Sequence, residues 1–330
     1  YGVGLNQFGE IGSVSNAISI PTRIINEQVA GIATSTIHSL LLKKDGSLWE
    51  VGKSGITGTI TIPKKIHDGP IVSFAAGEGT AFIIKPDGSM WSAGYHGEGR
   101  LGDGTTENRT SFAKVIDSGV KKVFSVGKSA AVIKNDGSLW TFGRNQNGQL
   151  GNGTQVNSPH PLKVESNGVI NASTSSDRII YVKSDGSLWG MGINSSFVFQ
   201  NSILNNLYLT PVRIVESGVT KVAMGGMHII FLKEDGSVWG RGDNHSGQLG
   251  QLTGSMYKDP VQIVSSGALD VAAGSNFSMI LMEDGKILTF GRNQYGQLGT
   301  GEPIFYQTPQ KLPNLKVKDV ATNTNGSYFV

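Results

Sequence analysis

The sequence of 330 residues has no cysteine and few charged residues. The missing cysteine excludes disulfides, thiolate metal sites and cysteine nucleophiles. No apolar run approaches the roughly 18 residues that a membrane helix needs, and the N-terminus lacks a basic segment followed by an apolar stretch, so neither membrane insertion nor a signal peptide is expected. Charged residues make up 16% of the chain, with a formal net charge of +3. Because lysine and arginine are scattered singly, no nucleic-acid partner is predicted.

Glycine is abundant, and it accompanies a repeat of about 49 residues that is marked by the dipeptide Asp-Gly. The 46 glycines are about twice the average usage and suit tight turns between short strands, so an all-β fold is predicted. Repeats of about 20 to 50 residues are typical of solenoids and propellers. Apolar runs flank each Asp-Gly, which predicts a hairpin closed by a type I′ turn, because that turn needs positive φ. The six copies begin at Asp45, Asp87, Asp136, Asp185, Asp235 and Asp284.

Two further markers follow Asp-Gly at fixed spacing and are interpreted as structural. A large apolar residue four positions after the aspartate is predicted to pack between stacked sheets. A glycine seven positions after it predicts a bulge or a close backbone approach. The first marker is Trp49, Trp91, Trp140, Trp189 and Trp239. The second is Gly52, Gly94, Gly143, Gly192, Gly242 and Gly291, with Gly4 aligned to them.

The ends of the chain indicate how the repeats close. Each repeat continues with Gly-x-[Leu/Ile]-Gly, interpreted as a tight loop with a buried apolar plug, and then with Pro-x-x-apolar, which occurs in seven copies against six hairpins when Phe112–Val115 is included. Residues 1–24 and 313–330 each match half a repeat. We therefore predict one domain, residues 1–330, with seven blades and a ring closed by both termini, which removes open sheet edges. The seventh hairpin would lie outside the chain, which is expected to be a piece of something longer.

The run Asp136-Gly-Ser-Leu-Trp140, followed by Gly143-Arg-Asn-Gln-Asn-Gly148-Gln-Leu-Gly151 and Pro161, strongly resembles the RCC1 family, named for the regulator of chromosome condensation. The resemblance covers the whole chain and implies a seven-bladed β-propeller of four-stranded blades. The residues Asp-Gly-Ser-Leu-Trp are more similar to those of the bacterial members of the family. This similarity favours a secreted or cell-surface bacterial protein, and the sequence leaves the compartment open.

Several short motifs are interpreted as coincidence or structure. Gly97–Gly102 matches the dinucleotide fingerprint but is one copy of the repeat's loop, without the strand and helix that the fingerprint requires. Arg241-Gly-Asp243 spells an integrin-recognition tripeptide around the fixed strand glycine. His38 and His228 both lie seven residues before their aspartates and are predicted to be structural hydrogen-bonding residues. No local metal cluster or catalytic pair is found, so no metal, cofactor or catalytic residue is predicted.

The repeat breaks in two places, and these are where function is predicted. Residues 53–61 replace a longer loop, and residues 195–209 form an unusually apolar stretch. Exposed, the apolar stretch would be a partner site; buried, it would plug a degenerate blade, and the sequence leaves both interpretations open. The partner-binding candidates in and beyond this stretch are Phe197, Val198, Phe199, Tyr208, Tyr257, Phe305 and Tyr306.

Arg144, Arg241 and Arg292 are further partner-binding candidates, because they occur near one point of successive blades, together with Arg100 and Lys53. A ring of such cations would attract an anion or an acidic protein surface. The favoured alternative is a set of solvated turn residues.

The leading hypothesis is a monomeric, non-catalytic scaffold that presents loops to a protein partner. A first alternative, implied by the resemblance, is a guanine-nucleotide exchange factor for a Ran-type small GTPase, although no repeat carries an insertion that could act as a wedge. A second alternative is a carbohydrate-binding module or a propeller enzyme that uses the channel mouth.

Overall fold

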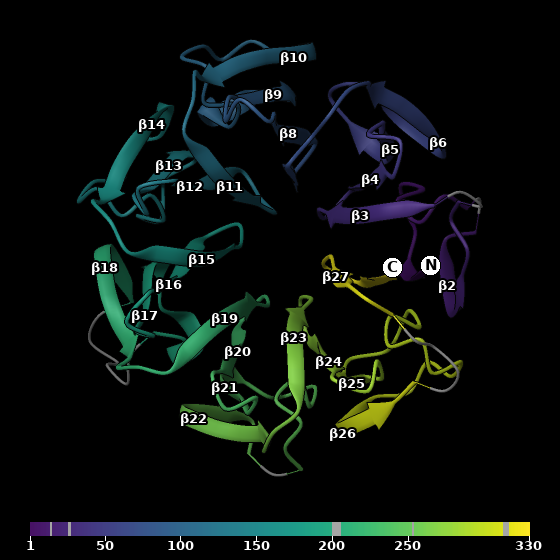
Figure 1. Cartoon of the computed structure of the whole chain (residues 1–330). Coiled ribbons are helices and arrows are strands. Elements are labelled where there is room, and N and C mark those ends of the chain that lie inside the picture. Colours follow the sequence, from purple (N-terminus) through teal and green to yellow (C-terminus); the bar gives the residue numbers. More distant parts are fainter. Residues whose placement is uncertain (14, 26–27, 200–205, 253, 313–316) are drawn as a thin grey trace.

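The described residues form seven four-stranded antiparallel sheets that stand as blades around a central channel (Figure 1). The computed structural model describes all residues except 14, 26–27, 200–205, 253 and 313–316. This arrangement is the seven-bladed propeller that the repeats predict. Among the described residues, no helix is long and apolar enough to cross a membrane.

The blades are numbered I to VII, and their strands are given from the first to the fourth. Blades I and II are β3 Val29–Thr34, β4 His38–Lys43, β5 Leu48–Ser54, β6 Gly58–His67, and β7 Ser73–Gly77, β8 Thr80–Ile84, β9 Met90–Gly94, β10 Arg109–Ile116. Blades III and IV are β11 Val120–Ser125, β12 Ser129–Lys134, β13 Leu139–Gly143, β14 Ser158–Glu165, and β15 Val169–Thr174, β16 Arg178–Lys183, β17 Leu188–Ile193, β18 Leu207–Val215.

The remaining strands complete the ring. Blades V and VI are β19 Val219–Met224, β20 His228–Lys233, β21 Val238–Asp243, β22 Met256–Val264, and β23 Ala268–Ala273, β24 Phe277–Met282, β25 Ile287–Gly291, β26 Tyr306–Lys311. Blade VII is β27 Val320–Thr322, β28 Gly326–Phe329, β1 Gly2–Leu5 and β2 Ala17–Thr22. Two short 3₁₀ turns, η1 Gly97–Gly99 and η2 Ser195–Phe197, lie in the loops of blades II and IV.

The first strand of each blade is the innermost, and first strands of neighbouring blades contact one another around the channel (Figure 1). Because the strands alternate in direction, the connections alternate between two faces. One face, here named the loop face, has the connections from first to second strand and the long loops from third to fourth strand. The opposite face, named the turn face, has the Asp-Gly turns, the connections between blades and both chain ends.

The Asp-Gly turns are tight, but they are not the predicted type I′ turns. Among the described residues, positive φ outside glycine occurs only at Glu98, Ser196 and Phe197, so no Asp of these turns adopts it. In blade III, Gly137 has φ 76° and donates to Lys134 O at 2.9 Å, which makes a three-residue loop with a left-handed glycine. The aspartate does not supply a positive φ; it stabilises the turn because its side chain accepts a hydrogen bond from the backbone amide two residues later.

Asp136 shows this role in detail. Its Oδ1 accepts from the Ser138 amide at 2.9 Å and from the Ser138 hydroxyl at 2.6 Å, and these bonds hold the pKa of the carboxyl below its usual value. Ser138 Oγ in turn accepts from Trp140 Nε1 at 2.9 Å. The same chain of bonds recurs in four other blades, at Asp45, Asp87, Asp185 and Asp235. In blade VI, Lys286 replaces the serine and donates to Asp284.

The tryptophans are half-buried at the margin of the blades rather than enclosed between sheets. Trp140 packs against the core that blades II and III share, while Lys134 Nζ lies 4.5 Å from the centre of its ring. An indole N–H requires a polar partner, and the serine of the same turn provides one only at the margin. The prediction of packing between sheets is therefore correct for part of each ring.

The strand glycines are structural, as predicted, and Gly143 shows why. It has φ 102°, and a Cβ added to it would lie 2.4 Å from Lys128 O. Gly4 in blade VII meets the same constraint, with φ 116° and a Cβ position 2.3 Å from Asn325 O. The third strand can thus approach the turn before the second strand only where no side chain stands between them.

The core lies between neighbouring blades and not within any one of them. One cluster, for example, joins Ala131, Ile133 and Leu139 of blade III to Ile179 and Tyr181 of blade IV, all of them buried. The tight loops extend these contacts, because a Cβ at Gly151 of blade III would lie 2.3 Å from Met191 Sδ of blade IV. Each blade therefore depends on its neighbour to cover its apolar face.

Strands from both ends of the chain close the ring, as predicted. β28 pairs antiparallel with β1, with Gly2 opposite Tyr328 and Gly4 opposite Gly326. The Tyr1 ammonium group donates to Phe329 O at 2.8 Å, and Phe329 N donates to Tyr1 O at 2.9 Å. Blade VII is thus assembled from two strands of each terminus.

The closure generates a stability prediction. Phe329 is buried in β28 beside Val3 and Leu312, so Phe329→Ala should lower the free energy of unfolding by about 3–5 kcal/mol. Phe305→Ala is the matched control, because this ring is 54% exposed and its loss should change stability by no more than about 0.5 kcal/mol. Chemical denaturation monitored by tryptophan fluorescence measures both. Equal effects of the two substitutions would contradict the packing of β28 in the core.

Candidate interaction surface

The long loops of the loop face are rigid platforms, and blade III shows how the repeat builds them. Leu150 is fully buried, and its amide donates to Asn145 Oδ1 at 2.9 Å. The Thr141 hydroxyl donates to Leu150 O at 2.8 Å. The predicted tight loop with a buried plug is therefore present, and both its amide and its carbonyl are fixed by side chains.

Blade IV keeps this platform although its sequence departs from the repeat. The Phe199 amide donates to Asn194 Oδ1 at 2.8 Å, so Phe199 takes the place of the leucine plug. Phe199 and Val198 are fully buried, and Tyr208, which is 7% exposed, meets the Phe199 ring edge-on at 5.9 Å. These three residues are core, so of the two interpretations that the sequence leaves open, the buried plug describes them and the exposed partner patch does not. Residues 200–205 of the same stretch lie outside the described residues.

Phe197 is the unusual residue of this loop, because it takes the position of a glycine. The equivalent Gly148 of blade III has φ 68°, and Phe197 has φ 57°. A bulky residue in the left-handed region costs about 1–2 kcal/mol and is a genuine conformational outlier. Its half-buried ring lies beneath Lys258 of blade V, whose Nζ is 4.6 Å from the ring centre. Backbone strain of this kind is found at functional sites.

Arg241 supports the blade IV loop from the neighbouring blade instead of facing solvent. Its guanidinium donates to Phe199 O at 3.2 Å and also to Lys258 O. The side chain is buried, and burial lowers the pKa of Arg241 to about 10. Asp243 is buried as well, so the Arg-Gly-Asp tripeptide is not accessible and its interpretation as coincidence holds.

Arg144 belongs to a network of compensated charges across three blades. Glu98 of blade II lies 3.4 Å from Arg100, 3.5 Å from Lys128 and 3.7 Å from Arg144. Arg144 also lies 3.8 Å from Asp177 of blade IV. These partly exposed pairs connect neighbouring blades, and each contributes little on its own.

A ring of free arginines is therefore not formed. Arg241 is buried beneath a loop, and Arg144 faces two carboxylates. Arg292 occupies the corresponding position in blade VI and donates to Gln294 Oε1 at 3.2 Å. Arg144 and Arg292 are half-buried and held by neighbouring side chains, so they are closer to the alternative of solvated turn residues than to a ring of free cations.

The shortened loop of blade I covers a buried carboxyl group that the sequence analysis missed. Glu50 is fully buried and accepts from Ser54 at 2.7 Å and from Thr57 at 2.8 Å, while Nε2 of buried His38 lies 3.7 Å away. Burial raises the pKa of Glu50 and lowers that of His38 to about 4. The signal was in the repeat, because Glu50 replaces the small hydroxyl residue that is Thr141 in blade III.

Exposed apolar side chains gather on the loops of blades V and VI. Met227, Leu252, Ile304 and Phe305 are each about half exposed or more, with Leu252 at 70%. The two loops are neighbours, because a Cβ added at Gly247 would lie 3.0 Å from the carbonyl oxygen of Tyr306, the residue after Phe305. We name Met227, Leu252, Ile304 and Phe305 the apolar patch. Of these only Phe305 was a sequence candidate.

Tyr257 and Tyr306, the remaining sequence candidates, are half-buried at the start of β22 and β26. A Cβ at Gly254 would lie 3.1 Å from Tyr257 Oη, so this ring packs under the blade V loop. Both residues therefore support the patch from below and add little exposed surface to it.

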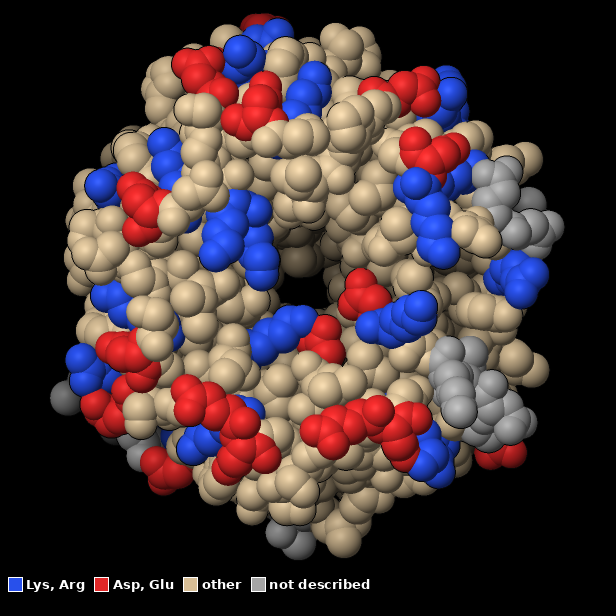
Figure 2. Space-filling model, viewed as in Figure 1, with Lys and Arg blue, Asp and Glu red and all other residues tan. Residues whose placement is uncertain are grey.

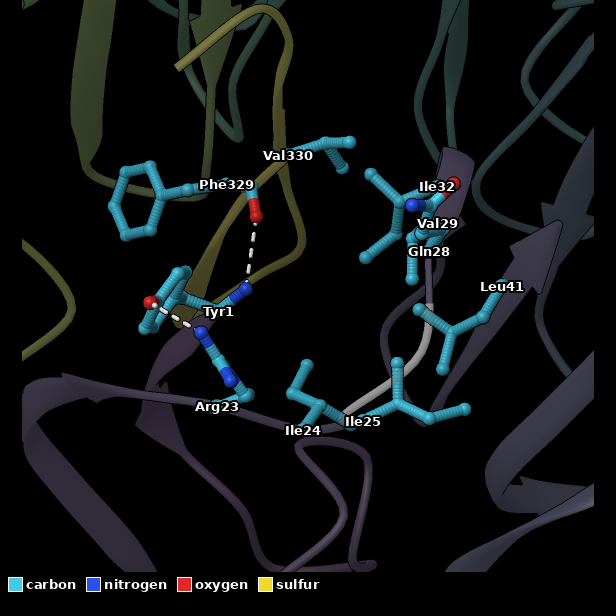
Figure 3. A pocket seen from close by; sticks show the side chains of 10 residues that line it. All are labelled: Tyr1, Arg23, Ile24, Ile25, Gln28, Val29, Ile32, Leu41, Phe329 and Val330. Carbon is cyan, nitrogen blue, oxygen red and sulfur yellow. Dashed lines mark hydrogen bonds between the residues drawn. The ribbon is translucent and has the colours of Figure 1, made fainter. Parts of the chain in front are cut away.

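Two hollows are further candidate sites, one beside the chain ends and one in the central channel. One of about 280 Å³ opens beside the paired chain ends and is lined by Tyr1, Arg23, Ile32, Leu41, Val330 and five further residues (Figure 3). The guanidinium group of Arg23, which lines this hollow, donates a hydrogen bond to Tyr1 Oη at 3.3 Å. The other, of about 590 Å³, belongs to the central channel and is lined mainly by small residues of the first strands. Among the described residues, no group of three His, Cys, Asp or Glu side chains could hold a metal ion.

The fold and the loop contacts define the class of protein, which is a closed seven-bladed propeller with rigid loops on one face. The profile of the RCC1-like domain family matches residues 53–330, so the chain belongs to this family. A search of curated proteins finds no match to the sequence.

Solved structures share the fold over nearly the whole chain. Human WBSCR16 superposes with a TM-score of 0.88 at 18% identity, covering 99% of this chain and 96% of the other. Prp20p from Saccharomyces cerevisiae, reported with its binding properties to Gsp1p and histones, superposes with a TM-score of 0.87 at 16% identity, covering 99% and 89%. Yeast RCC1 (Prp20) bound to Kap60 gives a TM-score of 0.87 at 15% identity, covering 99% and 87%. At these identities the likeness shows the fold alone.

The left-handed conformation of Phe197 can be tested by substitution. Phe197→Gly should be more stable than Phe197→Ala by about 1 kcal/mol, because alanine loses the ring and keeps the backbone cost. At the exposed β6 residue Ile62, the order should reverse, with glycine about 0.5–1 kcal/mol less stable than alanine. Chemical denaturation of the four variants measures their free energies of unfolding and shows whether glycine or alanine is more stable at each position. The same order at both positions would refute the strain at Phe197.

The buried histidines generate a pH prediction. His228 Nε2 lies 2.8 Å from Ser278 Oγ, and burial lowers the pKa of His228 to about 4. The unfolded chain takes up a proton near pH 6.5 and the folded protein only near pH 4, so this contribution to stability is complete above pH 6.5 and is lost as the pH falls toward 4. At pH 4.5 the loss is about 2–3 kcal/mol.

His228→Asn should therefore flatten the decline in unfolding free energy between pH 7 and pH 4.5 by about 2–3 kcal/mol. Other groups titrate equally in the two proteins, so the difference between the curves isolates His228. His160→Asn is the matched control, because this ring is exposed, and its curve should run parallel to that of the wild type. If the curve of unfolding free energy against pH for His228→Asn also ran parallel to that of the wild type, burial of His228 would not explain the decline in stability.

Proposed function

We propose that the protein is a non-catalytic scaffold that binds a protein partner through the loop face of blades V and VI. The observation that carries this proposal is the apolar patch of Met227, Leu252, Ile304 and Phe305 on neighbouring loops. Single exposed apolar residues are normal on protein surfaces, whereas several large ones on neighbouring loops favour an interaction site.

The surroundings of the patch support a binding role. Phe197 and Lys258 lie on the blade IV side, where a strained aromatic ring is held beneath a cation. Aromatic residues are enriched among the side chains that contribute most to binding energy. The plugged loops beneath the patch are fixed by side-chain hydrogen bonds, so little conformational entropy would be lost on binding.

The alternative of a glycan site has less support. It requires exposed aromatic platforms, and Tyr208 is buried while Phe197 is half-buried. Phe305 is the one sequence candidate that offers an open ring face. The propeller-enzyme alternative likewise finds no cluster of metal-binding side chains among the described residues.

Nucleotide exchange on a Ran-type GTPase is the second candidate function. It is favoured by the similarity to Prp20p, which is reported with binding to Gsp1p. The test is the release of labelled GDP from a Ran-type GTPase in the presence of this protein. Acceleration would support exchange, whereas an unchanged release rate would remove this candidate.

The scaffold proposal is tested by removing the patch. Chemical cross-linking in cells followed by mass spectrometry identifies partners of the wild type, and their affinity is then measured with purified proteins. The triple variant Leu252→Ser, Ile304→Ser, Phe305→Ser should weaken binding by about tenfold or more. The control is Ile20→Ser with Ile62→Ser, two residues equally exposed on outer strands. An equal loss of affinity in the control, or no loss of affinity in the triple variant, would contradict the proposal.

A further inference from the structure

The first strands share a bulge that places an extra residue at the channel mouth of the turn face. In blade III, Val120 pairs with Lys134 and Lys122 with Ile133, so Lys121 has no partner. The same interruption occurs in the first strands of blades I, IV, V and VI. Bulges of this kind aim a side chain away from the ladder. The extra residues are Ala30, Lys121, Ile170, Thr220 and Leu269.

The corresponding residues of blades II and VII are Val72 and Lys318, and we name the seven together the mouth ring. Aliphatic members of the ring are strongly exposed, with Val72 at 61% and Leu269 at 54%, and Ile170 at 39%. Lys121 and Lys318 are exposed as well. The ring therefore combines aliphatic and cationic side chains at one opening, on the face opposite the apolar patch.

The next residue of the first strand adds charge inside the ring in four blades, as Lys122, Lys221, Asp270 and Asp319. Lys221 is paired with Asp270 at 2.5 Å, whereas the ammonium groups of Lys121 and Lys122 have no hydrogen bond or ion pair within the described part of the chain. Burial and the neighbouring Lys221 and Lys121 lower the pKa of Lys122. Figure 2 shows lysine or arginine and acidic side chains gathered around the central opening, which is hollow. The blade III side of the opening thus carries two lysines that form no ion pair within the described residues, although Asp270 is near enough to act on Lys122.

A cavity of about 590 Å³ lies in the channel behind the ring. Its lining begins at Lys221 and Asn171, next to the ring, and runs along the first strands to their ends at the loop face. Hydrogen-bonding groups therefore lie behind the charged rim, and the mouth ring itself is the outer surface of the opening.

We propose that the channel mouth of the turn face binds an extended acidic segment of a partner protein, whose carboxylates lie on Lys121 and Lys122 and whose aliphatic side chains lie on Leu269 and Ile170. Charge complementarity selects the carboxylates, and the exposed aliphatic members of the ring select an apolar neighbour. A nucleic acid is a poorer match, because no aromatic ring in the mouth ring offers a stacking platform for bases.

The test uses a short fluorescein-labelled peptide rich in glutamate and leucine, with polarisation as the readout at about 0.15 M ionic strength. Lys121→Glu and Lys122→Glu should each weaken binding by about tenfold. Leu269→Ser should weaken it by a smaller factor, since it removes an apolar contact only. The matched control is Lys163→Glu, the same change at an exposed lysine on outer strand β14, which should leave binding unchanged. Circular dichroism checks that all variants are folded.

Three outcomes would overturn the proposal. The first is no binding of the peptide by the wild type. The second is equal weakening by Lys163→Glu, which would make the attraction a matter of net charge. The third is a lysine-dependent site that binds citrate or single-stranded DNA but not the peptide, which would make the ligand a small anion or a nucleic acid. A loss confined to the mouth variants supports the acidic segment.

Discussion

Pairing of the two chain ends within one sheet is the constraint on which the rest of this structure depends. Every blade buries its apolar faces against two neighbours, so a ring without blade VII would expose the facing sides of blades I and VI. The hydrogen bonds between β28 and β1, together with Phe329 and Val3 in the adjoining core, prevent this. The closing blade also carries a tight loop of its own, whose Gly9 approaches Thr61 of blade I as other loops approach their neighbours.

Closure of the ring holds the loops rigidly against their neighbours, and a rigid loop can keep a residue in a strained backbone conformation. In most blades a glycine occupies the left-handed position where the tight loop meets the next blade, because any side chain would strike its outer strand. Blade IV holds phenylalanine in this position, and the loop still forms because Asn194, the Phe199 plug and Arg241 of blade V hold it. A single exception of this kind is tolerated because the surrounding packing fixes the backbone, as expected for a site where strain has a function.

The repeat predicted the blade count, the closure and the structural glycines, because these follow from spacing alone. It did not predict the turn type, since a type I′ turn and a left-handed glycine after a type I turn both accept Asp-Gly. It left the burial of Val198 and Phe199 open and did not predict that Arg241 is buried, because the period says which blade a residue belongs to and not whether its side chain points into the core. It also passed over Leu252 and Met227, because a single leucine or methionine in a polar loop carries no signal until neighbouring loops are placed side by side.

The two faces obtain their chemistry from different parts of the repeat. On the loop face the third-to-fourth connection varies in length and composition, so apolar side chains accumulate there, while charges such as Arg144 and Glu98 compensate one another across blades. On the turn face the Asp-Gly turns are short and similar, and the residues of the mouth ring vary from blade to blade, because the rest of the blade does not need them for packing. A bulge repeated around a ring places independent residues at one opening. Lys121, Ile170 and Leu269 thus stand together although about one repeat separates the first two in sequence and about two repeats separate the last two.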